Sequence, residues 1–135
     1  MDNLSSLSSI SNKKTSGIRS EHISIFWQDS FLDSNQQTIK YPAIVYSILA
    51  VNSSDEDIFI SCYAIDGSET ANDLNRTFLV YNRMIPRGEN LEIVKNNIFL
   101  TENDSLVAFC ESSTHICDFL VSFSYIFNWK SIQFY

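Results

Sequence analysis

The segment FLVSFSYI, residues 119–126, decides the fold class of this chain. Two sets of side chains alternate along it: Phe119, Val121, Phe123 and Tyr125 on one side, and Leu120, Ser122 and Ser124 on the other. A period of two over this length is typical of a β-strand with one buried face, whereas an amphipathic helix has a period of 3.6. We therefore predict a long strand at about 116–127.

The segments that precede residues 119–126 also have the residue pattern of β-strands. Runs of β-branched and aromatic residues alternate with polar turns from residue 21 onward. We predict further strands at 22–28, 38–52, 57–66, 76–83, 89–94, 97–100 and 104–111, with residues 29–37 as a loop. Pro42 has no backbone N–H, so a bulge or a strand start is expected there. The predicted fold is all-β: an antiparallel two-sheet β-sandwich, with the jelly roll as one form that this strand spacing allows.

The two ends of the chain differ from its middle. Residues 1–20 contain seven Ser, and residues 128–135 (NWKSIQFY) are aromatic. We expect a flexible or extended N-terminal arm over 1–20, a β-sandwich domain over 21–127 and an aromatic C-terminal tail over 128–135. The arm is either a disordered tail or a segment that binds a neighbouring subunit. The candidate interface residues are Leu4, Leu7 and Ile10 in the arm and Trp129, Phe134 and Tyr135 in the tail.

The charge distribution limits the classes of partner. The chain has a net charge of −7. Residues 1–20 carry Lys13, Lys14 and Arg19 against Asp2, a balance of +2, so the remaining residues carry −9. An acidic body repels nucleic-acid phosphates. No apolar run reaches the roughly 18 residues of a transmembrane helix, and the first 20 residues lack the apolar core of a signal peptide. We expect no nucleic-acid and no membrane partner.

Residues with metal-binding or redox chemistry are few and poorly spaced. Cys62, Cys110 and Cys117 are odd in number and form no C-x-x-C pair, so a disulfide framework is not expected. Reduced thiols fit a reducing assembly compartment. His115 and Cys117 with Cys110 do not have the spacing of a zinc site. The acidic turns, such as 55–57, do not match the calcium loop pattern. We expect no metal and no cofactor.

Catalytic motifs are likewise missing from the sequence. The two histidines, His22 and His115, lie in no recognisable nucleophile–base motif, and there is no G-x-S-x-G, Walker A or dinucleotide fingerprint. We therefore expect a protein that is not an enzyme and has no catalytic residues. Exposed aromatic rings can stack on sugars, and Trp27 and Trp129 are the candidates for such a role; packing in the core or in an interface is the alternative.

Residues 41–126 resemble a family of small bacteriophage virion proteins. The resemblance rests on turn-and-strand segments that follow one another along the chain. They are YSILAVNSSDEDIFIS (46–61), CYAIDG (62–67), IPRGENLEI (85–93), NIFLTENDSLVAF (97–109) and FLVSFSYI (119–126). Members of that family are compact β-sandwiches, present in the particle as repeated accessory or decoration components. No functional residue is carried over from the family to this chain.

This resemblance implies a structural component of a bacteriophage particle: a capsid decoration or cement protein, or a neck or tail accessory protein. Its expected partners are copies of itself, as a homotrimer or a higher symmetric oligomer, and other virion proteins. Its expected location is the virion, assembled in the host cytoplasm. The alternative that the residues leave open is a β-sandwich module that binds a glycan or a host surface.

Overall fold

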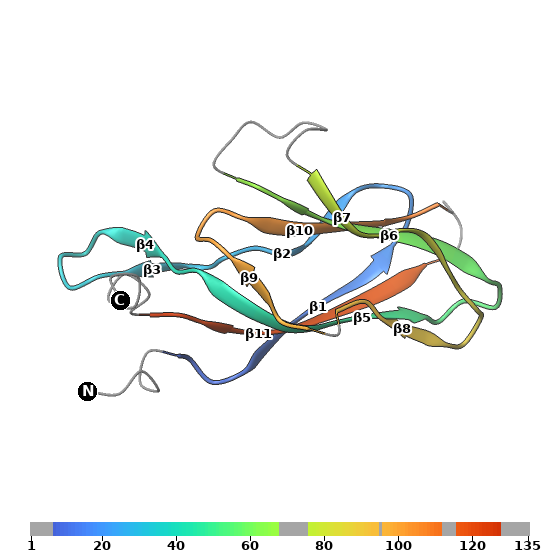
Figure 1. Cartoon of the computed structure of the whole chain (residues 1–135), viewed down its shortest axis with the longest axis horizontal. Coiled ribbons are helices and arrows are strands. Elements are labelled where there is room, and N and C mark those ends of the chain that lie inside the picture. The colour runs from blue at the N-terminus through green and yellow to red at the C-terminus, as the bar shows by residue number, and fades with distance from the viewer. Residues whose placement is uncertain (1–6, 68–75, 95, 112–115, 128–135) are drawn as a thin grey trace.

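The computed structural model describes residues 7–67, 76–94, 96–111 and 116–127 (Figure 1). Within these ranges the chain forms antiparallel strands and no helix, so the predicted all-β class is confirmed. The strands are β1 (Ser11–Ile18), β2 (Ile23–Phe26), β3 (Ser30–Leu32), β4 (Thr38–Lys40), β5 (Ala43–Asn52), β6 (Ile58–Ile65), β7 (Arg76–Ile85), β8 (Asn90–Glu92), β9 (Ile98–Leu100), β10 (Ser105–Cys110) and β11 (Cys117–Tyr125). Nothing helical in the described part is long and apolar enough to cross a bilayer.

Two sheets pack face to face, as the sequence predicts for a sandwich (Figure 1). The β11 sheet has the order β1-β11-β5-β8, with β9 also paired to β5. The β10 sheet has the order β2-β10-β6-β7, and β3 with β4 forms a separate hairpin. The facing side chains of the two sheets share one apolar core, in which the largest fully buried members are Phe26, Phe119, Ile18, Ile25, Ile48, Ile58, Ile60, Ile85 and Leu106.

Strand β11 confirms the alternation that predicts it. Phe119, Val121 and Phe123 point into the core and are almost completely buried, whereas Leu120 and Ser122 lie on the outer face and are half-buried. The strand pairs with β5 on one side and with β1 on the other. Because β11 pairs with a strand on each side, the backbone groups along both of its edges are hydrogen-bonded. Its apolar face is buried in the core.

Within the predicted flexible or extended arm over residues 1–20, residues 11–18 are extended and form β1, an edge strand of the β11 sheet. It pairs with β11 from Ser11 opposite Phe123 to Ile18 opposite Cys117. An isolated bridge between Leu7 and Ile126 continues the pairing toward the N-terminus. Within β1 only Ile18 is fully buried, so backbone hydrogen bonds rather than apolar burial hold the strand in place. A Ser-rich sequence gives little strand signal, and residues 1–6 lie outside the described ranges.

The segment 29–37, expected to be a loop, contains β3 and the turn of the β3–β4 hairpin. The carboxylate of Asp33 accepts hydrogen bonds from the backbone N–H groups of Asn35 and Gln37, at 2.8 and 2.9 Å, which closes the turn. Phe31 attaches the hairpin to the sandwich by packing its ring against Tyr41. The strand predicted at 38–52 is divided at Pro42 into β4 and β5, as expected for a residue without a backbone donor.

The side chain of Asn52 ties the β5–β6 turn to the end of β7. Asn52 is completely buried, and its amide donates to the carbonyl oxygens of Glu56 and Ile85 at 2.8 and 2.9 Å. Its own side-chain oxygen accepts from the backbone N–H of Ser54 at 3.0 Å. Both the nitrogen and the oxygen of this buried amide have hydrogen-bond partners, so the side chain fixes the position of the turn relative to β7.

Candidate interaction surface

The described histidine is part of a packed aromatic cluster rather than of a nucleophile–base pair. The Nδ1 atom of His22 lies 2.8 Å from the hydroxyl of Tyr63, and its ring stacks on Phe109 with centroids 4.1 Å apart. Tyr63 is itself buried. A catalytic base needs a nucleophile within hydrogen-bond reach, and these contacts supply only a phenol and a phenyl ring. His115 lies outside the described residues.

All three cysteines are buried in the core. Burial raises the pKa of the Cys62 thiol to about 12. Burial also raises the pKa of Cys117 to about 12, and the neighbouring Cys110 adds to the effect. A reactive cysteine needs a lowered pKa and access to solvent. Cys62 and Cys117 therefore behave as small core residues.

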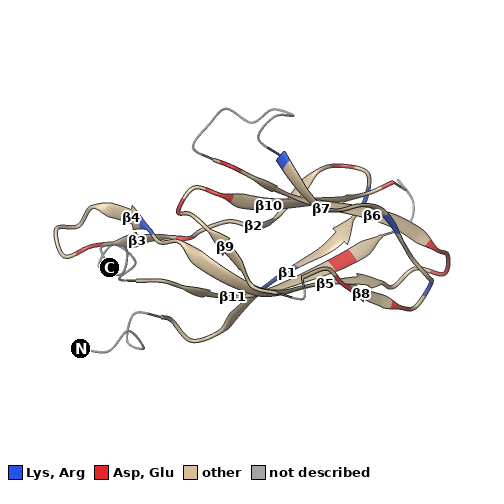
Figure 2. Cartoon of the chain, in the orientation of Figure 1, with Lys and Arg blue, Asp and Glu red and all other residues tan. Residues whose placement is uncertain are grey.

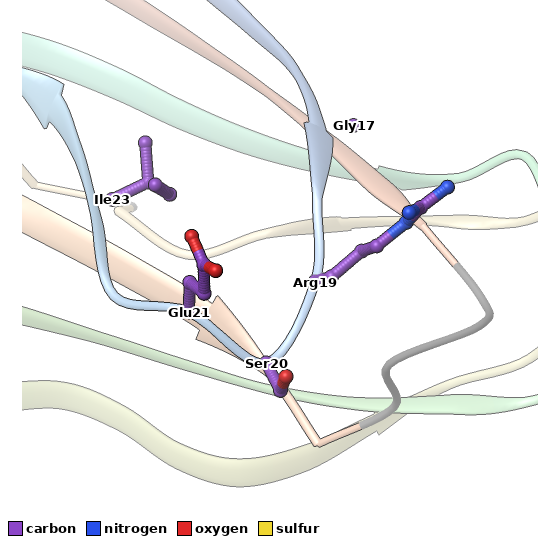
Figure 3. A pocket seen from close by; sticks show the side chains of 5 residues that line it. All are labelled: Gly17, Arg19, Ser20, Glu21 and Ile23. Carbon is purple, nitrogen blue, oxygen red and sulfur yellow. The ribbon is translucent and has the colours of Figure 1, made fainter.

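Two hollows lie on the surface of the described part of the chain. A pocket of about 360 Å³ at the β1–β2 connection is lined by Gly17, Arg19, Ser20, Glu21 and Ile23. Figure 3 shows the Arg19 side chain extending away from the Glu21 carboxylate. A more open hollow lies at the acidic turn 55–57 and Arg87. Among the described residues, no group of three or more His, Cys, Asp or Glu side chains is placed to hold a metal ion.

Large apolar side chains gather instead on the outer face of the β10 sheet, at its β7 edge. We call the four residues Phe59, Phe78, Tyr81 and Met84 the apolar strip. Phe59 lies directly opposite Met84 in the β6–β7 pairing, and the ring centroids of Phe78 and Tyr81 are 5.0 Å apart. All four are exposed, and Tyr81 most of all, at 71%. The strip consists of two exposed apolar pairs, Phe59 with Met84 and Phe78 with Tyr81, and exposed apolar side chains gathered on one face are a feature of interaction sites.

The backbone of β7 is irregular beside the strip. The β6–β7 register shifts twice, between Ile60 and Cys62 and between Cys62 and Tyr63. At the first shift Asn82 adopts a left-handed φ of 52°, and its N–H donates to the buried Ser61 hydroxyl at 2.8 Å. Bulges of this kind twist an edge strand and hinder pairing with a foreign strand. The strip therefore offers its side chains for contact more readily than its backbone.

Charged residues of both signs lie at the two ends of the apolar strip (Figure 2). At the start of β7, the Arg76 guanidinium lies over the rings of Tyr63 and Phe78, at 5.2 and 5.9 Å from their centroids. At the other end is the acidic turn, defined as residues 55–57 (Asp-Glu-Asp), where the Asp57 carboxylate accepts from the backbone N–H of Arg87 at 3.1 Å. Asp66 follows Ile65, which pairs with Arg76, so each end of the strip combines Arg with acidic residues.

A second exposed aromatic residue, Trp27, lies beside an ion pair. The Lys13 ammonium is 4.3 Å from the Trp27 ring centroid and 3.1 Å from an Asp29 carboxylate oxygen. The Tyr125 hydroxyl donates to the other oxygen of Asp29 at 2.9 Å. Desolvation raises the pKa of Asp29, but the hydrogen bonds from Lys13 and Tyr125 and the charge of Lys13 outweigh it, so the net pKa lies below the usual 3.8. Trp27 is 46% exposed, which leaves part of its ring open to solvent.

Of the six candidate interface residues at the two chain ends, two lie in the described part of the structure, Leu7 and Ile10. Leu7 bridges to Ile126 of the same chain and is 38% exposed, whereas Ile10 is 66% exposed. The other four lie outside the described residues: Leu4, Trp129, Phe134 and Tyr135. Nothing in the structure brings Leu7 or Ile10 close to the apolar strip, since they flank β1 at the far edge of the other sheet.

The sequence predicts strands over 57–66 and 76–83, which contain all of the apolar strip except Met84, but it does not predict the strip itself. In RTFLVYNRMI (76–85), apolar residues occupy both alternating sets, so the pattern does not say which face is buried. Apolar residues in both alternating sets are the sequence signal that large apolar side chains lie on both faces of this strand. The sequence matches no protein-family model and no curated protein.

Proposed function

We propose that this chain is a non-enzymatic structural component of a bacteriophage particle, a capsid decoration or cement protein or a neck or tail accessory protein, that acts through protein–protein assembly. The observation that carries the proposal is the apolar strip: two pairs of large apolar side chains lie exposed on the outer face of a well-packed sandwich, near its β7 edge. The described His and the cysteines are used in packing, which favours binding over chemistry.

The strand order supports the virion part of the proposal. If β3, β4 and β9 are set aside, the eight remaining strands number 1 to 8 along the chain. The β11 sheet then reads 1-8-3-6 and the β10 sheet 2-7-4-5. We infer that this is the jelly-roll arrangement, which occurs in viral capsid and lectin domains. The family resemblance of residues 41–126 points to the first of these two groups.

The distribution of charge is compatible with assembly at high copy number. With a net charge of −7, free subunits repel one another and stay soluble until a specific contact overcomes the repulsion. Symmetric particle components need surfaces that complement copies of the same chain or a neighbouring virion protein. The apolar strip supplies one such surface.

The test is the solution mass of the full chain by light scattering after size exclusion, followed over a range of protein concentrations. We expect a discrete homo-oligomer, for which a homotrimer or a higher symmetric assembly is the form that the family resemblance implies. A strictly monomeric chain that also fails to bind purified particles added to it would overturn the proposal.

A second candidate function is favoured by one observation, the half-exposed Trp27 ring beside the Lys13–Asp29 pair. A sugar ring can stack on the indole while a charged or polar neighbour accepts its hydroxyl hydrogen bonds. This candidate predicts binding on a glycan array that is lost in Trp27→Ala. Phe99→Ala is the matched control, because Phe99 is similarly exposed, at 56%, and belongs to β9. Absence of binding to every glycan on the array would contradict this function.

A further inference from the structure

We propose that strand β1 is exchanged between copies of this chain. Residues 11–18 of one copy then occupy, on a second copy, the edge of β11 that they occupy within their own chain in the structure. The exchange deepens the proposed function, on which it rests, because it names the segment that joins one copy to the next. Of the two roles that the sequence allows for the N-terminal segment, it gives residues 11–18 the one of binding a neighbouring subunit.

The site that receives β1 is already filled in the single chain, and this shows what fits it. Strand β1 pairs with β11 from Ser11 opposite Phe123 to Ile18 opposite Cys117. The side chain of Ile18 is 1% exposed and belongs to the apolar core. A second copy carries the same residues in the same order, so its β1 can make every one of these contacts. Exchange of an identical strand therefore needs no new surface.

Polar side chains fix the register in which β1 of a second copy would pair. The Lys13 ammonium lies 3.1 Å from a carboxylate oxygen of Asp29 and 4.3 Å from the centroid of the Trp27 ring. The hydroxyl of Ser122 donates to the side-chain oxygen of Asn12 at 2.7 Å. Because Asp29, Trp27 and Ser122 all belong to the receiving part of the fold, they would hold the incoming strand in a single register.

The connection between β1 and β2 allows β1 to leave its own chain. Residues 19–22 carry the chain from the β11 sheet to the β10 sheet, and all four are exposed. The Arg19 carbonyl accepts from the N–H of Cys110 at 2.6 Å, and the His22 ring stacks on Phe109. Between these two anchors, Ser20 and Glu21 line the pocket of about 360 Å³ instead of packing in the core (Figure 3). A rearrangement at residues 20–21 therefore disturbs little of the fold.

The closed connection also interrupts the pairing of β1 with β11. Their register shifts between Thr15 and Ile18, where Gly17 has a left-handed φ of 75°. After Ile18 the chain turns away from β11 to reach the other sheet. A short connection that must turn in this way favours exchange of the strand it carries, because it can extend in the exchanged form. Since both forms otherwise contain the same contacts, the connection and the protein concentration decide between them.

The experiment uses pairs of introduced cysteines to show whether β1 pairs with β11 of its own chain or of another copy. The 12–122 pair, Asn12→Cys with Ser122→Cys, puts two thiols opposite each other on β1 and β11. The 47–122 pair, Ser47→Cys with Ser122→Cys, is the matched control, because residue 47 lies opposite residue 122 on β5, inside the sheet. Ser122→Cys alone measures chance contact between copies.

The three positions are exposed or half-buried, so all variants are expected to fold, and thermal unfolding followed by circular dichroism checks this. Light scattering gives the mass of each full-length variant. Oxidised glutathione then forms the disulfides in the native protein, and a denaturing gel without reductant separates linked copies from single chains. Counting the remaining thiols in the single chains identifies an internal disulfide.

We expect linked copies, as dimers or larger species, for the 12–122 pair, and single chains for the 47–122 pair and for Ser122→Cys. Insertion of Gly-Ser-Gly-Ser after Ser20 relaxes the connection, so in the 12–122 variant it should shift the linked copies to single chains. Single chains with an internal 12–122 disulfide, in protein that light scattering shows to be assembled, would overturn the exchange and leave the proposed assembly function standing. A monomer with the same internal disulfide would also overturn the exchange, and only its failure to bind purified particles would overturn the function as well.

Discussion

The burial of the Cys62 thiol predicts a specific loss of stability in alkaline solution. Cys62 is completely buried in the core, and desolvation raises its pKa from 9.0 to about 12. Because the raised pKa favours the neutral thiol in the folded state, its contribution is fully present below about pH 9. It is lost as the pH rises toward the folded pKa of about 12. The unfolded chain ionises first, and ionisation therefore draws the equilibrium toward unfolding.

The magnitude follows from the two pKa values. At about pH 11, ionisation stabilises the unfolded chain by roughly 3 kcal/mol through this one thiol, while the folded chain gains almost nothing. We expect Cys62→Ala to lower stability at about pH 8 because it removes a buried sulfur atom. Between about pH 8 and pH 11, however, the variant should lose about 3 kcal/mol less stability than the wild type.

The assay is urea unfolding followed by circular dichroism at both pH values, with a reductant present so that no disulfide forms. Ile60→Val is the matched control, because Ile60 is equally buried on the same strand and carries no ionisable group. The control should differ from wild type by the same amount, about 1 kcal/mol, at both pH values. If the difference between wild type and Cys62→Ala is also the same at both, the reasoning from thiol burial is refuted.

Three further predictions concern the side chains that hold the fold. Asn52→Ala should cost about 2–4 kcal/mol in urea unfolding because it leaves the buried carbonyl of Ile85 without its donor; a loss below about 1 kcal/mol would contradict this. Since the pKa of Asp29 is lowered, its contribution is present above about pH 4 and is lost on further acidification. Asp29→Asn should therefore unfold with a shallower acid dependence, by less than about 1 kcal/mol for this half-exposed pair, and equal slopes would count against it. Gly67→Ala should be strongly destabilising, because a Cβ there would collide with the backbone oxygen of Asn103. Gly88→Ala has open space at a φ of 72° and should cost only about 1 kcal/mol, so equal melting temperatures for the two variants would be inconsistent with the packing.

Part of the fold could be predicted from local sequence because local physics alone determines it. The alternation in β11 and the missing donor of Pro42 each leave a mark within a few residues of the chain. The exclusion of nucleophile and metal motifs also needed only residue types and spacing. The sheet partners of these strands could not be predicted in the same way, because cross-strand pairing joins residues far apart in the sequence.

Strand β1 and the apolar strip show what only the tertiary structure decided. Residues 11–18 are rich in Ser and Lys, and they form a strand because β11 offers them an unpaired edge. The exposure of Phe78 and Tyr81 likewise follows from the packing of the two sheets, because these side chains lie on the outer face of the β10 sheet, away from the shared core. Sequence alone determined that this chain is all-β, since side-chain periodicity is a local property. Which faces and edges remain open is set by long-range packing, and these open surfaces are where binding occurs.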